Sequence, residues 1–359
     1  MLFCGDISLP YERAIELKEF PEKFKQEIWF GNLEGSLVKK EDSSYESLIQ
    51  NPKVFNSYDA VKQLLNDIPF KSFNLANNHL QDAAPASVTI NNIHDLGIEC
   101  VGAGKNIVFS SKSIVLNDTD GVKYRIFAFG WDCINCIYST KKKQGVNPYI
   151  RKHVLDSVKL HLNADEKALC FFHWNYELEL YPQPFDRQIA MDLIDLGVEA
   201  VIGCHAHRVQ PIEFYKGKPI VYGLGNFLFK QGTYCNNRLV FPECSNEELV
   251  FEIKNGKFFI HLFEYNRKES KLLFITSSEI GPNENFKHKA SFSGFNHKDY
   301  ECFFKKNRIQ RKLLPIFYTT ENILGFFMKS KWIKLRGWVI DILVSVGFKN
   351  FSRIKNKKL

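Results

Sequence analysis

The sequence predicts an α/β protein whose sheet is covered by helices on both faces. Six short apolar runs, each ending in Gly, Asn, Asp or His, are typical of strands buried on both sides; they lie at residues 2–4, 28–30, 72–76, 168–172, 200–202 and 220–222. Helical patterns lie between several of them, at residues 60–65, 86–96, 154–162 and 187–196. Strands that alternate with helices indicate this architecture.

Later elements follow from turn and stop signals. Gly97 and Gly197 come just after the last apolar position of two helical patterns, where glycine commonly ends a helix. Asn255-Gly256 predicts a hairpin, because this pair favours a two-residue turn. We therefore expect three regions: a catalytic body at 1–277, a linker or irregular segment at 278–304, and a basic, aromatic, helical tail at 305–359.

The composition is that of an ordinary globular protein. The chain has 359 residues, of which 45% are hydrophobic and 25% charged, and this balance excludes a disordered chain, a collagen or a small disulfide scaffold. Nine scattered cysteines indicate reduced thiols, and a single Cys133-x-x-Cys136 pair does not complete a four-ligand zinc site. The first residues show no signal peptide, so we expect a cytoplasmic protein.

Potential metal ligands follow the predicted strands. These are Asp6, Glu34, Asn78, His173, His205 and His207, and His79 and Asn226 are residues of the same types. Functional groups collect beyond the carboxyl ends of strands in such sheets, and this mixture of oxygen and nitrogen suits Mn, Fe or Zn. Two ions that share a carboxylate can hold a phosphoryl group and activate a water, so the set predicts phosphoester hydrolysis.

These motifs together resemble the CapA family of capsule and poly-γ-glutamate synthesis proteins, which is similar to calcineurin-like metallophosphoesterases. The resemblance spans roughly residues 1–230 and rests on Gly5-Asp6-Ile7, Asn32-Leu33-Glu34, Leu75-Ala76-Asn77-Asn78-His79, Gly102-Ala103-Gly104, His173-Trp174, and the runs from Gly203 to Glu213 and Gly223 to Phe227. It implies a four-layer αββα sandwich. It also implies metal binding by the six ligands above, and a general-acid role for His79.

Three departures from the family patterns concern the metal site. Metallophosphoesterases have a His two residues after the first Asp, and here that position is Ser8, which weakens one of the two expected ion sites. The Gly expected after His-Trp is Asn175, and the usual His-His-Pro-His is Cys204-His205-Ala206-His207. The last two changes spare the nominal ligands.

Three further residues are candidates for substrate binding. Arg208 directly follows His207 and can pair with a phosphate or carboxylate, or else form a structural salt bridge. Trp174 can stack on a sugar or simply form a wall of the site, and Asn226 follows the last predicted strand of the set.

The positive charge lies in the tail. Residues 305–359 hold fourteen Lys and Arg against two acidic residues, a net +12, which leaves −4 of the total +8 for the rest. The stretch 332–348 is apolar but broken by charges, so it predicts no transmembrane helix. An amphipathic helix with basic and aromatic residues suits peripheral contact with the inner membrane face, although packing on the body is the alternative. No recognition motif favours nucleic acid.

Three functions fit this sequence. The first is a metal-dependent phosphoester hydrolase of capsule or exopolysaccharide biosynthesis, which would use a metal-activated water on an anionic polymer, glycan or lipid-linked intermediate. The second is a non-catalytic factor that binds polymer or assists assembly at the membrane, which Ser8 motivates. The third is a metal-dependent hydrolase of γ-glutamyl amides, because an activated water also attacks carbonyl carbon.

Overall fold

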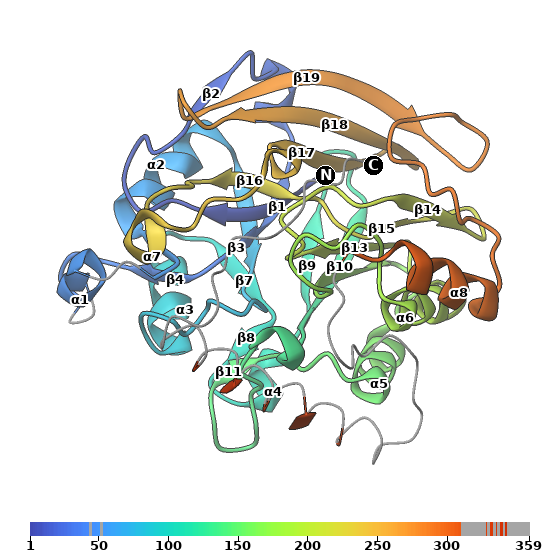
Figure 1. Ribbon diagram of the computed structural model, residues 1–359, viewed down its shortest axis with the longest axis horizontal. Coiled ribbons are helices and arrows are strands. Elements are labelled where there is room, and N and C mark those ends of the chain that lie inside the picture. The colour runs from blue at the N-terminus through green and yellow to red at the C-terminus, as the bar shows by residue number, and fades with distance from the viewer. Residues whose placement is uncertain are drawn as a thin grey trace.

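The computed structural model describes residues 1–42, 45–50 and 53–309, together with seven isolated positions between 328 and 342. Two β-sheets form its centre, and helices lie outside them (Figure 1). The predicted tail at 305–359 lies almost wholly outside the described residues. In the part of the chain that the structure describes, no helix is both long and apolar enough to span a bilayer.

The larger sheet has the strand order β2-β19-β18-β17-β1-β3-β6-β7, and β16 also pairs with β1. Its strands β1, β3, β6 and β7 are mutually parallel, whereas β17 to β19 form antiparallel hairpins. The strands are β1 (Leu2–Ser8), β2 (Glu16–Lys18), β3 (Trp29–Leu33), β6 (Phe70–Asn74), β7 (Glu99–Val101), β16 (Asn226–Phe229), β17 (Glu247–Lys254), β18 (Lys257–Asn266) and β19 (Lys271–Ile280).

The smaller sheet has the order β14-β15-β13-β12-β10-β9, and its four central strands are parallel. The strands are β9 (Ile114–Asn117), β10 (Lys123–Gly130), β12 (Lys167–His173), β13 (Ala200–Cys204), β14 (Ile212–Tyr215) and β15 (Lys218–Val221). Two short ribbons pair β4 (Ser36–Val38) with β5 (Phe55–Ser57) and β8 (Ala103–Gly104) with β11 (Gly145–Val146).

Helices cover the outer faces of the sheets. The α-helices are α1 (Tyr45–Gln50), α2 (Tyr58–Asp67), α3 (Ala86–Asp95), α4 (Ile107–Ser110), α5 (Arg151–His161), α6 (Pro184–Asp195), α7 (Tyr234–Asn237) and α8 (His297–Asn307). Three 3-10 helices are η1 (Glu22–Gln26), η2 (Asp132–Ile134) and η3 (Glu243–Ser245). Helix α6 begins with Pro184 at its first position and with a capping box between Gln183 and Asp186, a favourable start for a helix.

The two sheets pack face to face through aromatic side chains. Phe30 of β3 contacts Phe171 of β12 with ring centroids 5.2 Å apart, and both are fully buried. Phe214 of β14 contacts Phe258 of β18 in the same way at 6.2 Å. This packing of two sheets between helices confirms the expected α/β sandwich.

The sequence patterns located most of the elements that position the site. All six apolar runs and all four helical patterns are strands and helices, and the Asn255-Gly256 turn joins β17 to β18. Strand β10 was not expected, although it lies inside the smaller sheet, between β12 and β9. Helix α8 begins at His297 in the segment expected as a linker and ends at Asn307 in the expected tail, and its Tyr300 hydroxyl donates to the Pro182 carbonyl.

Candidate metal centre

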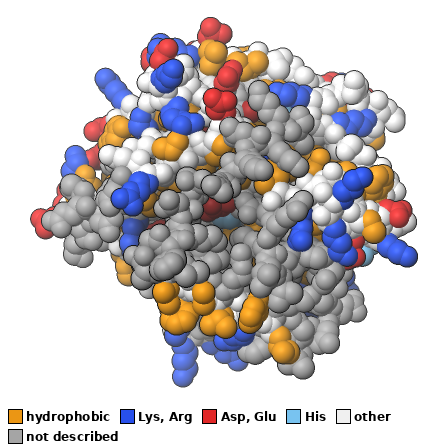
Figure 2. All heavy atoms as spheres, in the orientation of Figure 1, with side chains coloured by type: hydrophobic (Ala, Val, Ile, Leu, Met, Phe, Trp, Pro, Cys, Tyr) orange, Lys and Arg blue, Asp and Glu red, His pale blue; other side chains and the backbone are white. Residues whose placement is uncertain are grey.

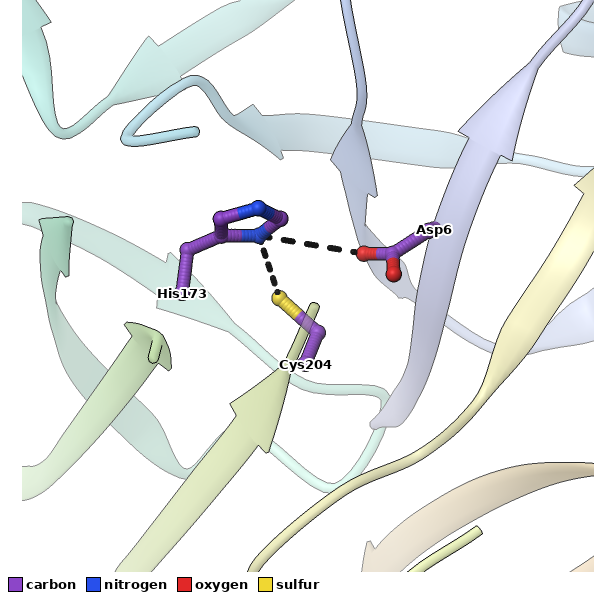
Figure 3. Close-up of side chains that lie close together, drawn as sticks. All are labelled: Asp6, His173 and Cys204. Carbon is purple, nitrogen blue, oxygen red and sulfur yellow. Dashed lines mark hydrogen bonds and ion pairs between the residues drawn. The ribbon is translucent and has the colours of Figure 1, made fainter. Parts of the chain in front are cut away.

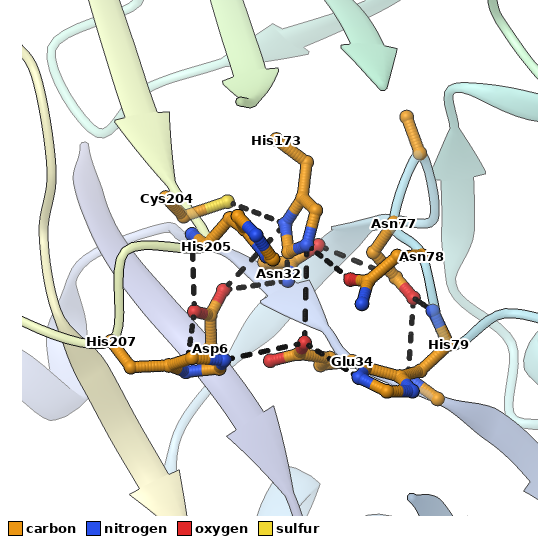
Figure 4. Close-up of polar contacts among 12 residues, drawn as sticks. Asp6, Asn32, Glu34, Asn77, Asn78, His79, His173, Cys204, His205 and His207 are labelled. Atoms are coloured by element: carbon orange, nitrogen blue, oxygen red, sulfur yellow. Dashed lines mark hydrogen bonds and ion pairs between the residues drawn. The ribbon is translucent and has the colours of Figure 1, made fainter. Parts of the chain in front are cut away.

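The site lies where strands of both sheets end at a common edge (Figure 4). Asp6 of β1 is in register with Asn32 of β3 and with Asn226 of β16. His173 ends β12 and is in register with Cys204, the last residue of β13. The structure therefore brings together all six predicted ligands, which are Asp6, Glu34, Asn78, His173, His205 and His207.

Asp6 is a fully buried carboxylate with donors on both oxygens. The Asn32 amide donates to Oδ1 at 2.8 Å, and the His205 backbone N–H donates to Oδ2 at 3.2 Å. His207 Nδ1 lies 3.3 Å from Oδ2. Burial nevertheless raises the pKa of Asp6, because desolvation of the charge outweighs these contacts.

Glu34 differs from Asp6, because neither of its carboxylate oxygens has a hydrogen-bond partner among the described residues. Its side chain is fully buried, and burial raises its pKa well above the usual range. Three imidazole nitrogens surround Oε1, with Nε2 of His79 and of His173 at 3.8 Å and Nε2 of His207 at 3.9 Å. These separations are too long for hydrogen bonds. Ligands of one zinc ion lie roughly 3.3 Å apart, so Oε1 of Glu34 and Nε2 of His207 can share a cation after a small adjustment.

The ligand atoms form two groups, each with its atoms within 4.8 Å of one another. One group is Asp6, His173 and Cys204 (Figure 3), and the other is Glu34, His205 and His207. Burial lowers the pKa of His173 well below the usual range, so its ring is neutral and can bind a metal. Buried carboxylates beside neutral imidazoles and a thiol are a donor set that suits a divalent transition metal.

Asn78, the sixth predicted ligand, makes a direct contact with another one. Its Oδ1 lies 2.7 Å from His173 Nε2, so the amide oxygen accepts a hydrogen bond from a protonated Nε2. A metal-bound histidine usually donates its second ring N–H in this manner. Asn78 thus lies in the centre and fixes the orientation of His173 in this arrangement.

His79, the predicted general acid, lies at the rim of the centre. Its side chain is 26% exposed, whereas the side chains of His173 and Glu34 are fully buried. Nδ1 lies 2.7 Å from Oδ2 of Asp82, and Nε2 faces Glu34. This carboxylate orients the ring so that Nε2 faces the centre, the geometry that a proton donor requires.

Ser8, which stands where the family pattern has a histidine, adds no ligand to the centre. Its hydroxyl is 2.6 Å from the Tyr234 hydroxyl and donates to the Phe55 carbonyl at 3.2 Å. Both partners are buried protein groups, so Ser8 is held by the body of the protein. The Asp6 group consequently receives no donor from this position.

The three substrate candidates occupy different environments. Trp174 is fully buried, stacks on Phe172 with ring centroids 4.5 Å apart, and donates to the Tyr222 carbonyl, which favours a packing role behind the site. Asn226 Oδ1 lies 2.9 Å from His207 Nδ1 and supports that ring. Arg208 is buried and has no ion pair with a described carboxylate; its Nη1 donates to the Leu178 carbonyl at 3.5 Å.

The loop after β13 has an unusual backbone. His205 and His207 have φ values of 89° and 50°, in the left-handed region that residues other than glycine rarely adopt. Gly203 precedes them, and a Cβ there would lie 2.2 Å from both Trp174 Nε1 and the Tyr222 carbonyl oxygen. Packing beneath the loop therefore requires glycine, and the surrounding structure maintains a strained loop that carries two ligands.

Three residues of the site were not predicted from the sequence. Asn32 and Cys204 come from strand registers that no sequence pattern specifies. Asp82 had a usable signal, because it follows His79 by three residues in a turn that brings their side chains together.

Comparison with known proteins agrees with the motifs of the site. The family model described as "Bacterial capsule synthesis protein PGA_cap" matches residues 17–231, more than half of the chain. This range includes every predicted ligand except Asp6.

Individual relatives match shorter parts. The capsule biosynthesis protein CapA of Bacillus anthracis is 29% identical over 209 residues, which are 56% of this chain and 50% of that protein. The PGA biosynthesis protein CapA of Bacillus subtilis is 28% identical over 56% of this chain and 53% of its own. A "probable polyglutamine synthesis accessory protein" of Mycobacterium tuberculosis is 30% identical over 42% of this chain and 43% of its own. The chain spans about half the length of the curated relatives it matches.

A solved structure of wild type Vps29 complexed with zinc, from Entamoeba histolytica, aligns with 79% of this chain and 100% of its own. The identity is 10% and the TM-score is 0.24, which is too low to bear on the fold or the site.

Proposed function

Because the chain belongs to the PGA_cap family of bacterial capsule synthesis proteins, we propose that it serves capsule or poly-glutamate synthesis as a metal-dependent phosphoester hydrolase. Its substrate would be an anionic polymer, a glycan or a lipid-linked intermediate. The names of the relatives support the biosynthetic process in this proposal. The side chains at the edge of the two sheets support the metal-dependent chemistry.

One observation carries the proposal of a metal centre. Glu34 is a buried carboxylate that lacks a hydrogen-bond partner among the described residues and is surrounded by three imidazole nitrogens. An uncompensated charge of this kind is costly to bury, so a cation at this position explains why the arrangement exists. A divalent ion there would lower the pKa of a bound water and neutralise charge on a phosphoryl group.

The protein side chains then divide the remaining work. His79, which Asp82 orients, is placed to protonate the leaving oxygen, and its partial exposure gives it access to a substrate. Arg208 is a buried cation with no carboxylate within salt-bridge distance among the described residues, since Glu179 and Glu247 act on it from farther away, and an anionic substrate group is a suitable counter-ion. The His205–His207 loop holds its ligands in a fixed geometry.

The experiment combines elemental analysis with a phosphoester assay in added Mn²⁺ or Zn²⁺. We expect bound metal and turnover in the wild-type chain, and loss of both when Asp6→Asn is combined with His205→Ala. Glu16→Gln on the exposed strand β2 is a matched control that should retain both. Hydrolysis that persists unchanged in the double variant would contradict the metal assignment.

The same assay separates the alternatives. The non-catalytic assembly factor is motivated by the loss of a ligand at Ser8. It would be favoured if the wild-type chain bound no metal and an Asp6→Asn strain still produced polymer. Bound metal with release of glutamate from a γ-glutamyl peptide, and none of phosphate from phosphoesters, would favour the amide hydrolase.

Contact with an anionic membrane surface is a second part of the proposal. Val108, Phe109 and Ile137 are 67%, 41% and 55% exposed. Exposed lysines surround them: Lys105, Lys112, Lys141, Lys142 and Lys143. Figure 2 shows apolar and basic side chains together at its lower edge, where Figure 1 places α4 and the β8–β11 ribbon. Apolar side chains ringed by lysine suit the surface of an anionic bilayer.

The basic tail is proposed to join this contact. Six apolar residues among the isolated positions that the structure describes there are exposed and helical: Met328, Trp332, Leu335, Trp338, Val339 and Ile342. Their three- and four-residue spacing places them on one face of a helix. Sedimentation with phosphatidylserine vesicles should capture the intact chain, and both Phe109→Ser and Trp338→Ser should weaken capture. No capture of the wild type would contradict the membrane contact.

A further inference from the structure

We propose that Cys204 is itself a metal ligand and that its thiolate, with Asp6 and Nδ1 of His173, forms a site selective for zinc over manganese. This inference rests on the metal centre proposed above and goes beyond it, because it assigns a sulfur ligand that the family resemblance does not include. It also names the class of metal that the chain should prefer.

Strand register places the thiol beside the other two ligands. His173 and Cys204 are paired residues at the ends of the parallel strands β12 and β13, so their side chains project from the same face. Sγ lies 3.1 Å from His173 Nδ1, and this nitrogen lies 3.9 Å from Asp6 Oδ1 (Figure 3). Sulfur and nitrogen ligands of one tetrahedral zinc ion lie roughly 3.5 Å apart, so the observed spacing needs little rearrangement.

The hydrogen bond on the other side of the imidazole makes Nδ1 available. Asn78 Oδ1 lies 2.7 Å from His173 Nε2, and an amide oxygen only accepts hydrogen bonds. In the neutral ring the proton is therefore on Nε2, and Nδ1 is an acceptor that faces Cys204 and Asp6 and lies 3.4 Å from the Asn32 amide nitrogen.

Cys204 also adds a donor atom to the Asp6 group, whereas Ser8 adds none. The Ser8 hydroxyl is hydrogen-bonded to Tyr234 and Phe55, so it adds no donor to the Asp6 group. The thiol of Cys204 reaches the same group from the opposite sheet. All nine cysteines lie among the described residues and none forms a disulfide, so no disulfide prevents this sulfur from binding a metal.

Ligation replaces the thiol proton. Without a metal, the Cys204 S–H is within 3.4 Å of the Phe172 carbonyl oxygen and can donate to it. When the divalent ion binds, the S–H bond breaks, a sulfur–metal bond forms and the proton leaves to solvent, so no oxidant or reductant is needed. Thiolate is a soft ligand that favours zinc over manganese, whereas a site with only oxygen and nitrogen ligands discriminates less.

The test is the spectrum of the Co²⁺-loaded full-length protein. A cobalt–thiolate bond gives an intense near-ultraviolet charge-transfer band, and we expect this band in the wild type and in Cys170→Ala, but not in Cys204→Ala or Cys204→Ser. Cys170 is the matched control because it is buried in β12 and lies outside both ligand groups. Circular dichroism verifies that each variant is folded. The preference for Zn²⁺ over Mn²⁺ should fall at least about tenfold in Cys204→Ser.

The outcomes separate this inference from the proposed function. Bound Co²⁺ and phosphoester turnover without the band would overturn the sulfur ligand and leave the hydrolase intact. The band without turnover on any phosphoester would support the sulfur ligand and contradict the hydrolase. A band that survives in folded Cys204→Ala would also overturn the inference, and failure of the wild type to bind Co²⁺ would overturn both.

Discussion

The two sheets contribute different chemistry to the same centre. The larger sheet brings the carboxylates Asp6 and Glu34, and the loop after β6 adds Asn78 and His79. The smaller sheet brings His173 and Cys204 at the ends of its strands, and the loop after β13 adds two more histidines. Neither sheet alone holds a complete ligand group. The centre therefore depends on how the sheets pack.

Weakening the contact between the sheets should have the largest effect. Phe171→Ala removes a buried ring that contacts Phe30 across the interface, and it should lower the free energy of unfolding by about 3–5 kcal/mol in urea titrations. Metal affinity of the folded variant should fall as well. Phe185→Ala is the control, because this buried side chain of α6 packs on Tyr149 outside the sheet interface. If the two variants have equal metal affinities, the site does not depend on sheet packing.

The contribution of a buried acid outside the ligand groups to folding stability should depend on pH but not on bound metal. Burial raises the pKa of Asp186, at the start of α6, to about 7. Because the folded chain holds this proton more tightly than the unfolded chain, its stabilising contribution is complete below about pH 4 and is lost as pH rises through 7, by up to about 4 kcal/mol. Asp186→Asn should flatten the stability profile in this window, with and without Zn²⁺. A profile that the variant leaves unchanged would refute the assignment.

A substitution at the exposed rim of the centre, at Asp82, should lower the catalytic rate and leave the stability of the fold nearly unchanged. Asp82→Asn removes the charge that orients His79, and we expect kcat to fall about tenfold with little change in KM. Asp95→Asn, at an exposed ion pair with Lys39, should leave the rate unchanged. An equal loss in both variants would argue for a general electrostatic effect.

The sequence predicted the positions of the ligands better than their contacts. Asp6, Glu34 and His173 could be predicted because each ends or follows a buried apolar run, and the carboxyl ends of parallel strands meet at one edge. Strand β10 was missed because its run begins with alternating polar residues. The role of Cys204 could not be predicted, because it depends on the register of β12 against β13, which is set by tertiary packing.

The packing roles of Trp174 and Ser8 were likewise beyond the sequence. A tryptophan beside a predicted ligand is equally compatible with a stacking surface and with a buried wall, and only its contacts with Phe172 and Tyr222 distinguish them. The hydrogen bond of Ser8 to Tyr234 joins residues 226 positions apart. Such long-range partners are decided by the closed fold.

If Glu34 is buried because its carboxylate binds a cation, the Glu34→Gln variant should lose both the cost of burying the charge and the benefit of the metal. Metal-free Glu34→Gln should be more stable than the metal-free wild type, by about 1–3 kcal/mol, because it removes a buried carboxylate without a described hydrogen-bond partner. Added Zn²⁺ should raise the melting temperature of the wild type and leave that of the variant nearly unchanged. A variant that is less stable without metal and is still stabilised by Zn²⁺ would contradict the account.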